Sequence, residues 1–153
     1  LALGNHMQDL RLHLAQIHAS QLQAAFERCW NTQSREFDLS SDVSLGIPAL
    51  ICASLSVEIG LKALLRQCGI EPKREHNLAV LLEKLPTDIY AQIKAETLKS
   101  YPDFDVQIEN AKKAFVDWRY FYEAEKDMHI NILFVGALGA AVQKTIGLKW
   151  TVS

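Results

Sequence analysis

Apolar residues recur at three- and four-residue spacings along most of the chain, and this period predicts helices. The first amphipathic helix is expected from Met7 to about Gln33, a segment without glycine or proline. Its apolar face is predicted to consist of Leu10, Leu14, Ile17, Leu22, Ala25, Phe26 and Cys29. Residues 32–44 lose the period and are rich in serine and aspartate, so they indicate a loop that leads to the next helix.

The segment from Leu45 to Cys68 has few polar positions and is predicted to be the central, most buried helix, with Gly69 as its C-cap. Four further helices are expected at residues 78–85, 89–99, 106–124 and 128–146. Candidate N-caps for three of them are Asn77 or His76, Thr87 or Asp88, and Asp127. Small residues in the last helix, among them Gly136 and Gly139, permit close approach of a neighbour, either within the chain or across a dimer.

This pattern predicts an all-α fold, an antiparallel four-helix up-down bundle with one or two additional short helices. The 153 residues fit one domain, assigned to residues 7–153, and residues 1–6 are interpreted as a cloning remnant with Met7 as the native start. The longest apolar run, residues 130–142, is shorter than the roughly 20 residues that cross a membrane. A cytoplasmic protein is therefore expected.

Composition narrows the function classes. Sixteen Lys and Arg against eighteen Asp and Glu give a net charge of −2, which argues against a globally basic surface but leaves a local basic patch open. The three cysteines lack metal-ligand spacing and are predicted to be reduced. The sequence has no glycine-rich phosphate loop and no His-Glu-x-x-His or Cys-x-x-Cys motif, so neither a metal nor a cofactor is expected.

Residues 115–123 gather five aromatic side chains, one arginine and two carboxylates in nine positions. On a helix, Trp118 and Tyr122 would lie on one apolar ridge, while Arg119 and Glu123 would form an adjoining i, i+4 ion pair. One interpretation is an aromatic core seam beside an ordinary ion pair. The other is a site in which Arg119 holds an anion and the tyrosines line it.

A polar stripe runs along the otherwise apolar second helix at four-residue intervals. Its residues are Ser54, Glu58, Lys62 and Arg66. Glu58 and Lys62 fit an i, i+4 ion pair in the favourable orientation. Among the histidines, His76 has the best claim to a functional role, because it lies with Lys73 and Arg74 at a helix N-terminus, where N–H groups and the helix dipole favour anions. A capping or packing role for His76 is the alternative.

Three segments together resemble a known family. They are Ser56-Val-Glu58-Ile-Gly-Leu-Lys62-Ala-Leu-Leu65, then Lys73-Arg-Glu-His76-Asn-Leu78 leading into Leu81-Leu82-Glu-Lys-Leu85, and later Phe115-Val-Asp-Trp118-Arg119-Tyr-Phe-Tyr122-Glu123. In order and spacing, over roughly residues 10–145, the chain resembles the HEPN domains. The resemblance implies a small all-α bundle, often dimeric, from a prokaryotic defence, toxin–antitoxin or nucleotidyltransferase-partner system.

Many HEPN domains are metal-independent ribonucleases that use an arginine followed, after four to six residues, by a histidine near a dimer interface. This chain departs from the pattern, because nine residues separate Arg119 from the next histidine, His129. Tyr120 also follows Arg119 where active members often have a small polar residue. Arg11 and His18 have six residues between them, but they lie in the first helix, in the wrong part of the fold.

If the bundle closes as the resemblance implies, the polar stripe, the turn before the short helix and the aromatic segment converge in one groove. The residues expected to bind RNA or a nucleotide are Lys62, Lys73, His76, Arg119, Tyr122 and Glu123. The cations would hold phosphate, the tyrosine would stack on a base or bond a ribose, and His76 would move a proton without metal. The alternative is a polar network of Glu58, Lys62 and Arg119 that only fixes helix register.

Three functions follow from this reasoning. The first is a HEPN-like RNA- or nucleotide-binding domain of a bacterial defence or toxin–antitoxin type system, without the usual ribonuclease motif. The second is a metal-independent endoribonuclease with a rearranged site that uses His76 or His129 with Arg119. The third is a non-catalytic dimerisation or interaction module. Expected partners are a second copy of the chain, RNA or a nucleotide, and an antitoxin or nucleotidyltransferase, with no membrane.

Overall fold

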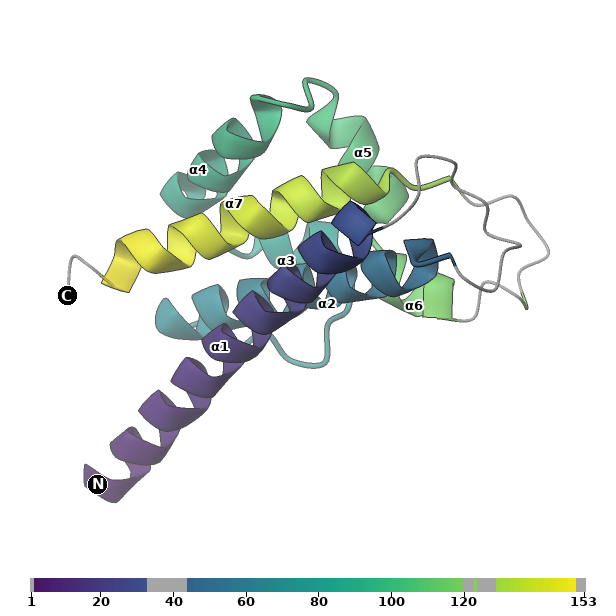
Figure 1. Ribbon diagram of the computed structural model, residues 1–153. Helices are drawn as coiled ribbons and strands as arrows, with labels where there is room; N and C mark the ends of the chain where they lie inside the picture. The colour runs from purple at the N-terminus through teal and green to yellow at the C-terminus, as the bar shows by residue number, and fades with distance from the viewer. Residues whose placement is uncertain (1, 33–43, 120–122, 124–128, 151–153) are drawn as a thin grey trace.

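A computed structural model describes residues 2–32, 44–119, 123 and 129–150, without the side chains of residues 2–6, 119 and 148–150 (Figure 1). These residues form seven helices and no strand, so the all-helical prediction is confirmed. The helices are α1 (Ala2–Thr32), α2 (Gly46–Gln67), α3 (Leu78–Glu83), α4 (Thr87–Leu98), α5 (Phe104–Ala111), α6 (Ala114–Arg119) and α7 (Ile132–Trp150).

The second helix, α2, is the centre of the core, as its sequence predicts. It packs along α1, against α7 and against the short helices α3 and α6, while α4 covers another part of α7. Among the described helices α2 alone is long and apolar enough to cross a membrane. In its apolar 18-residue stretch, 61% is buried inside the protein. Such enclosure by neighbouring helices is the environment of a core helix.

The end of α2 is set by Gly69, which has a φ of +74°. The Gly69 N–H donates to the Arg66 carbonyl and the Ile70 N–H donates to the Leu65 carbonyl, each at 2.9 Å. This pair of bonds is the Schellman arrangement, which favours glycine because a side chain strains the left-handed conformation. The predicted C-cap is therefore confirmed, and it turns the chain back along α2.

The small residues of α7 serve a contact within the chain. A Cβ added at Gly136 would overlap the ring of Phe26, and one added at Gly139 would overlap the Gln23 side chain, both on α1. The Gln23 amide also donates to the Gly136 carbonyl at 3.1 Å. Gly136 and Gly139 thus let α7 approach α1 closely, so these two glycines serve a contact within the chain.

The face of α1 is only partly as predicted. Phe26 is buried, but Leu10, Leu14 and Ile17 are 48%, 54% and 40% exposed. On the middle of α1 the core is faced by Ala19, which is fully buried. The N-terminal half of α1 extends beyond the other helices (Figure 1), so it lacks the neighbours that would cover the predicted face.

The single helix expected at residues 106–124 is wrong. The structure has two helices, α5 and α6, separated by a turn at Lys112 and Lys113. The carbonyl of Lys112 accepts the N–H of Leu78, the first residue of α3, at 2.7 Å. A tertiary hydrogen bond to a helix N-terminus therefore takes the place of a bond that would have continued the helix.

Two other predicted helix starts are also wrong. The last helix begins at Ile132 and not at Met128, because the Asn131 side chain accepts the Phe134 N–H at 3.1 Å and acts as its N-cap. Helix α4 begins at Thr87 and not at residue 89, so its N-cap is Pro86 in place of Thr87 or Asp88. No side-chain hydrogen bond caps it. The expected cap Asp127 lies outside the described residues, as does most of the loop at 32–44.

Candidate functional site

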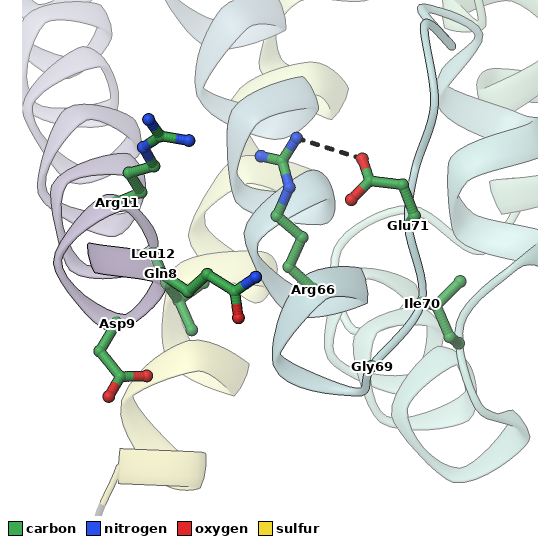
Figure 2. Close-up of a pocket in the computed structure, with 8 residues that line it drawn as sticks. All are labelled: Gln8, Asp9, Arg11, Leu12, Arg66, Gly69, Ile70 and Glu71. Carbon is green, nitrogen blue, oxygen red and sulfur yellow. Dashed lines mark hydrogen bonds and ion pairs between the residues drawn. The ribbon is translucent and has the colours of Figure 1, made fainter. Parts of the chain in front are cut away.

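Two polar features lie along α2, and the first is a cavity of about 510 Å³ between the N-terminal half of α1 and the end of α2 (Figure 2). Arg11 comes from α1 and Arg66 from α2, while Glu71 comes from the turn that follows Gly69. Arg66 and Glu71 form an ion pair at 3.4 Å, and both are well exposed. The cavity is therefore lined by two guanidinium groups and by two carboxylates, those of Asp9 and Glu71.

The second feature is centred on Glu58, a carboxylate in the apolar body of α2. Glu58 is only 5% exposed. The Lys62 ammonium, one turn further along the helix, lies 2.7 Å from Glu58 Oε1. The Lys62 side chain is 17% exposed, so its aliphatic part covers the helix while its charged end neutralises the buried carboxylate.

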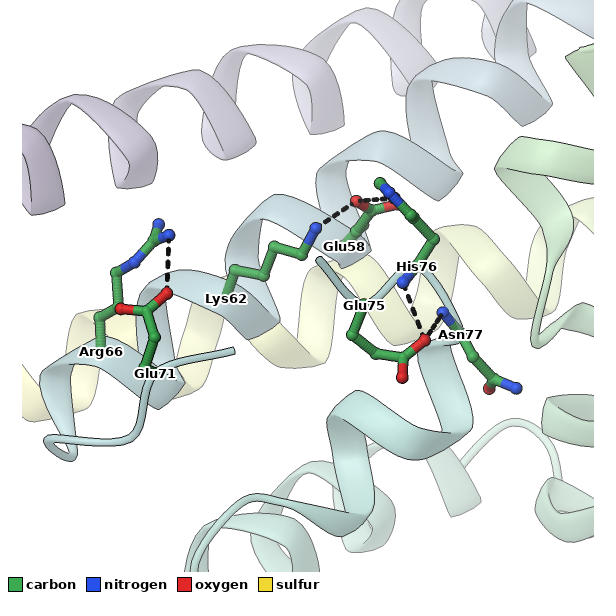
Figure 3. A network of polar contacts seen from close by, with 7 residues as sticks. All are labelled: Glu58, Lys62, Arg66, Glu71, Glu75, His76 and Asn77. Carbon is green, nitrogen blue, oxygen red and sulfur yellow. Dashed lines mark hydrogen bonds and ion pairs between the residues drawn. The ribbon is translucent and has the colours of Figure 1, made fainter. Parts of the chain in front are cut away.

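The turn between α2 and α3 brings a histidine to the same carboxylate. His76 Nδ1 lies 2.9 Å from Glu58 Oε1, the oxygen that also contacts Lys62 (Figure 3). An ionised carboxylate only accepts hydrogen bonds, so Nδ1–H is the donor in this pair when Glu58 is ionised. In the tautomer with the proton on Nδ1, Nε2 is an acceptor. The imidazole is 54% exposed, which leaves it accessible from solvent.

The position of His76 is fixed by its neighbours in sequence. Glu75 Oε1 accepts the N–H of Asn77 at 2.8 Å and the N–H of His76 at 2.9 Å. The Asn77 side chain in turn accepts the N–H groups of Ala79 and Val80, so it caps α3 as predicted. The hydrogen bond from Asn77 N–H, followed by that from His76 N–H and the charge of Lys84, lowers the pKa of Glu75.

One atom of the network lacks a protein partner in the described part of the chain. Glu58 Oε2 is buried and accepts no hydrogen bond there. A buried acceptor without a donor costs roughly 1–3 kcal/mol, and more when it carries charge. The network is therefore incomplete as a purely structural device.

The structure brings together three of the predicted site residues, Glu58, Lys62 and His76. Lys73 is exposed in the same turn, with a φ of 53°. Arg119 ends α6, which packs against α2, but its side chain lies outside the description. Glu123 is exposed.

The remaining parts of the predicted groove stay predictions. Tyr122 and the side chain of Arg119 lie outside the description. The stacking role of Tyr122 and the Arg119–Glu123 ion pair therefore stay predictions. His129 is exposed just before α7. Trp118 packs partly buried against the core, as expected for the aromatic seam.

Two features of the site escaped the sequence reasoning. Glu75 is the first, and its signal is its spacing, because a carboxylate two residues before an N-cap can accept the backbone N–H groups of the turn. Arg11 was noted only for its spacing to His18, and the cavity it shares with Arg66 depends on how α1 crosses α2. No signal in the sequence alone specifies that crossing.

No family model, curated protein or solved structure matches the chain. The functional argument therefore rests on the contacts of the site.

Proposed function

We propose that the chain is a HEPN-like RNA- or nucleotide-binding domain of a bacterial defence or toxin–antitoxin type system, acting in the cytoplasm. The finer architecture proposed with it is an antiparallel four-helix up-down bundle. The observation that supports the function is the arrangement at Glu58, where one buried oxygen orients Lys62 and His76 at the surface. These are the residues through which the HEPN resemblance runs.

The chemistry of this surface suits a phosphate group. Lys62 has three N–H donors and uses one for Glu58, so the others can bond a phosphate oxygen. Arg66 follows one turn later, about 6 Å along the helix axis. The planar guanidinium of Arg66 binds phosphate with paired bonds, and its single ion pair with the exposed Glu71 is weak.

The expected assembly extends this surface. A second copy of the chain is the proposed partner in solution, and an antitoxin or nucleotidyltransferase is the proposed partner in the cell. Arg119 and Tyr122 are proposed to add a phosphate contact and a stacking contact from the segment after α6. The glycines of α7 are used within the chain, so a dimer would need another face.

Salt-dependent RNA binding tests the proposal. Fluorescence anisotropy with a labelled single-stranded RNA should give an affinity that falls as salt increases. Lys62→Gln should weaken binding and reduce the slope of log K against log[salt] by about 1. Lys99→Gln is the matched control, because Lys99 also pairs with a glutamate but lies at the end of α4. Equal weakening by the two variants, or binding that ignores salt, would contradict the proposal.

A second candidate function is metal-independent RNA cleavage, and the His76–Glu58 hydrogen bond favours it. Nε2 would accept the proton of a ribose 2′-hydroxyl while the 2′-oxygen attacks the adjacent phosphorus. The bond from phosphorus to the 5′-oxygen breaks, and the leaving oxygen takes a proton from water. The products are a 2′,3′-cyclic phosphate and a 5′-hydroxyl, and His76 returns its proton to solvent.

Incubation with labelled RNA in chelator tests this candidate separately. Wild type should produce cyclic-phosphate ends, and His76→Gln should abolish them while binding persists. Arg119→Ala should also reduce cleavage if Arg119 contributes to the site. Absence of cleavage by the wild type removes the second candidate and leaves the binding function, whereas absence of both binding and cleavage leaves the interaction module.

A further inference from the structure

The cavity between α1 and the end of α2 is lined by two arginines, Arg11 and Arg66, and by two carboxylates, Asp9 and Glu71. Figure 2 shows the side chains of Arg11 and Arg66 pointing into the same space, whereas the Asp9 carboxylate points away from them. Within the described part of the chain Arg11 makes no ion pair, and Arg66 pairs only with Glu71. Two guanidinium groups of like charge gathered in this way favour a shared anion.

The shape of the cavity suits a small ligand with more than an anionic group. Its volume of about 510 Å³ lies in the range of small-molecule sites. Leu12 and Ile70 give it an apolar wall, and Gln8 and Glu71 can bond hydroxyl or amine groups. Glu71 is held beside Arg66 because Gly69 reverses the chain at the end of α2.

The cavity also continues the polar stripe of α2. Arg66 follows Lys62 by one turn, so the cavity lies at the end of the row that starts at Glu58 and His76 (Figure 3). A strand bound along that row would reach the cavity with its terminal phosphate.

We infer that the cavity binds a phosphomonoester, with Arg11 and Arg66 holding the phosphate and Glu71 bonding a sugar hydroxyl. The ligand is a 5′-nucleotide or the 5′-phosphate end of an RNA strand, which present the same chemistry. The inference deepens the proposed function and rests on it for the strand that would carry the phosphate. The cavity shares Arg66 with the polar row of α2 but contains neither Lys62 nor His76. Arg11→Gln and Lys62→Gln therefore test the cavity and the proposed function apart.

The test compares ligands with and without the phosphate. Calorimetry would measure adenosine 5′-monophosphate against adenosine, and anisotropy would measure one RNA sequence with a 5′-phosphate against the same RNA with a 5′-hydroxyl. If the mononucleotide or the RNA end binds in the cavity, its phosphate should lower the Kd by roughly tenfold or more relative to the ligand without phosphate. Charge-assisted hydrogen bonds have this magnitude. Arg11→Gln and Arg66→Gln should each remove most of that difference.

Arg28→Gln is the matched control, because Arg28 is exposed on α1 far along the helix from the cavity. It should keep the full phosphate effect, and circular dichroism should show all three variants folded. An effect with the mononucleotide alone identifies a free nucleotide, and an effect with RNA alone identifies a strand end.

The failures of the two proposals differ. If the phosphate changes binding of neither ligand, or if the arginine variants keep its full effect, the inference is overturned. Binding of the 5′-hydroxyl RNA that depends on Lys62 would still support the proposed function in that case. Phosphate-dependent binding of the mononucleotide without any RNA binding would keep the cavity and remove RNA as the ligand.

Discussion

Gly136→Ala should destabilise the protein, because the close contact of α7 with α1 leaves no room for a methyl group. The added Cβ would overlap Cε1 and Cζ of Phe26 and lie 3.2 Å from Cδ1. Phe26 is 6% exposed and belongs to the core cluster, so its ring cannot swing into solvent. The helices must separate, or the ring must leave its rotamer.

The magnitude follows from two opposing effects. Overpacking of a core costs about 1–3 kcal/mol, and overlap with two ring atoms places this substitution near the upper end. Replacement of glycine by alanine inside a helix contributes about 1 kcal/mol in the other direction. Gly136→Ala should therefore lower the free energy of unfolding by about 2 kcal/mol.

Gly147→Ala provides the matched control on the same helix. A Cβ added at Gly147 meets nothing within 4 Å, so only the propensity gain remains. The two variants should differ by about 3 kcal/mol, which for a domain of this size is a difference in Tm of roughly 6–12 °C. Urea unfolding followed by circular dichroism measures both.

The comparison can refute the packing argument directly. If Gly136→Ala is as stable as Gly147→Ala, α7 does not rest on Phe26 as described. Phe26→Leu combined with Gly136→Ala should recover part of the loss, because the smaller side chain gives the methyl group space. Strictly additive effects in that cycle would show that the two positions do not touch.

Two further predictions concern the turn that carries His76. Asn77→Ala should lower the free energy of unfolding by about 1 kcal/mol in urea titrations, because α3 loses its N-cap. Glu75→Gln should lower stability at neutral pH but not in acid. The folded-state pKa of Glu75 is lowered, so its contribution is present above the unfolded pKa of about 4.3 and is lost as pH falls through the folded value.

Either result has a clear opposite. An Asn77→Ala variant as stable as the wild type would mean that water replaces the cap without loss. A stability difference between wild type and Glu75→Gln that stays constant from pH 7 to pH 3 would show that the carboxylate charge is irrelevant to the turn.

The sequence predicted the parts of the fold that depend on local pattern. The long apolar run of α2 and Gly69 at its end need no tertiary information, and both are observed. The break between α5 and α6 depends on the bond from Leu78 to Lys112, residues that are distant in sequence. The Asn131 cap lies inside the apolar run 130–142, so the loss of hydrophobic period that marks other helix starts is absent there.

The same distinction holds at the site. Glu58 and Lys62 were predicted as a pair from their four-residue spacing, and they are one. Their contact with His76 was expected through the HEPN resemblance, since spacing says nothing about contacts across a turn. The cavity at Arg11 and Arg66 depends on the packing of two helices, which periodicity does not specify.

The incomplete bonding of Glu58 gives a last prediction, which separates function from structural support. Glu58 is the most buried member of its network, with a side chain 7% exposed against 17% for Lys62 and 54% for His76. Removal of one partner of a buried ion pair costs about 3–5 kcal/mol when the charge that remains is deeply buried, and less when that charge is more exposed. Glu58→Met should therefore lower the free energy of unfolding less than Lys62→Met does, because the charge it leaves unpaired, on Lys62, is the more exposed of the two.

Both variants should nevertheless bind RNA less tightly than the wild type. Glu58→Met removes the carboxylate that orients Lys62 and His76, and Lys62→Met removes the cation itself. Urea titration and anisotropy on the same preparations measure the two properties together. If Glu58→Met lost as much stability as Lys62→Met, the network would act mainly to fix helix register. A small loss of stability in Glu58→Met together with weaker RNA binding would show that Glu58 serves the site more than the fold.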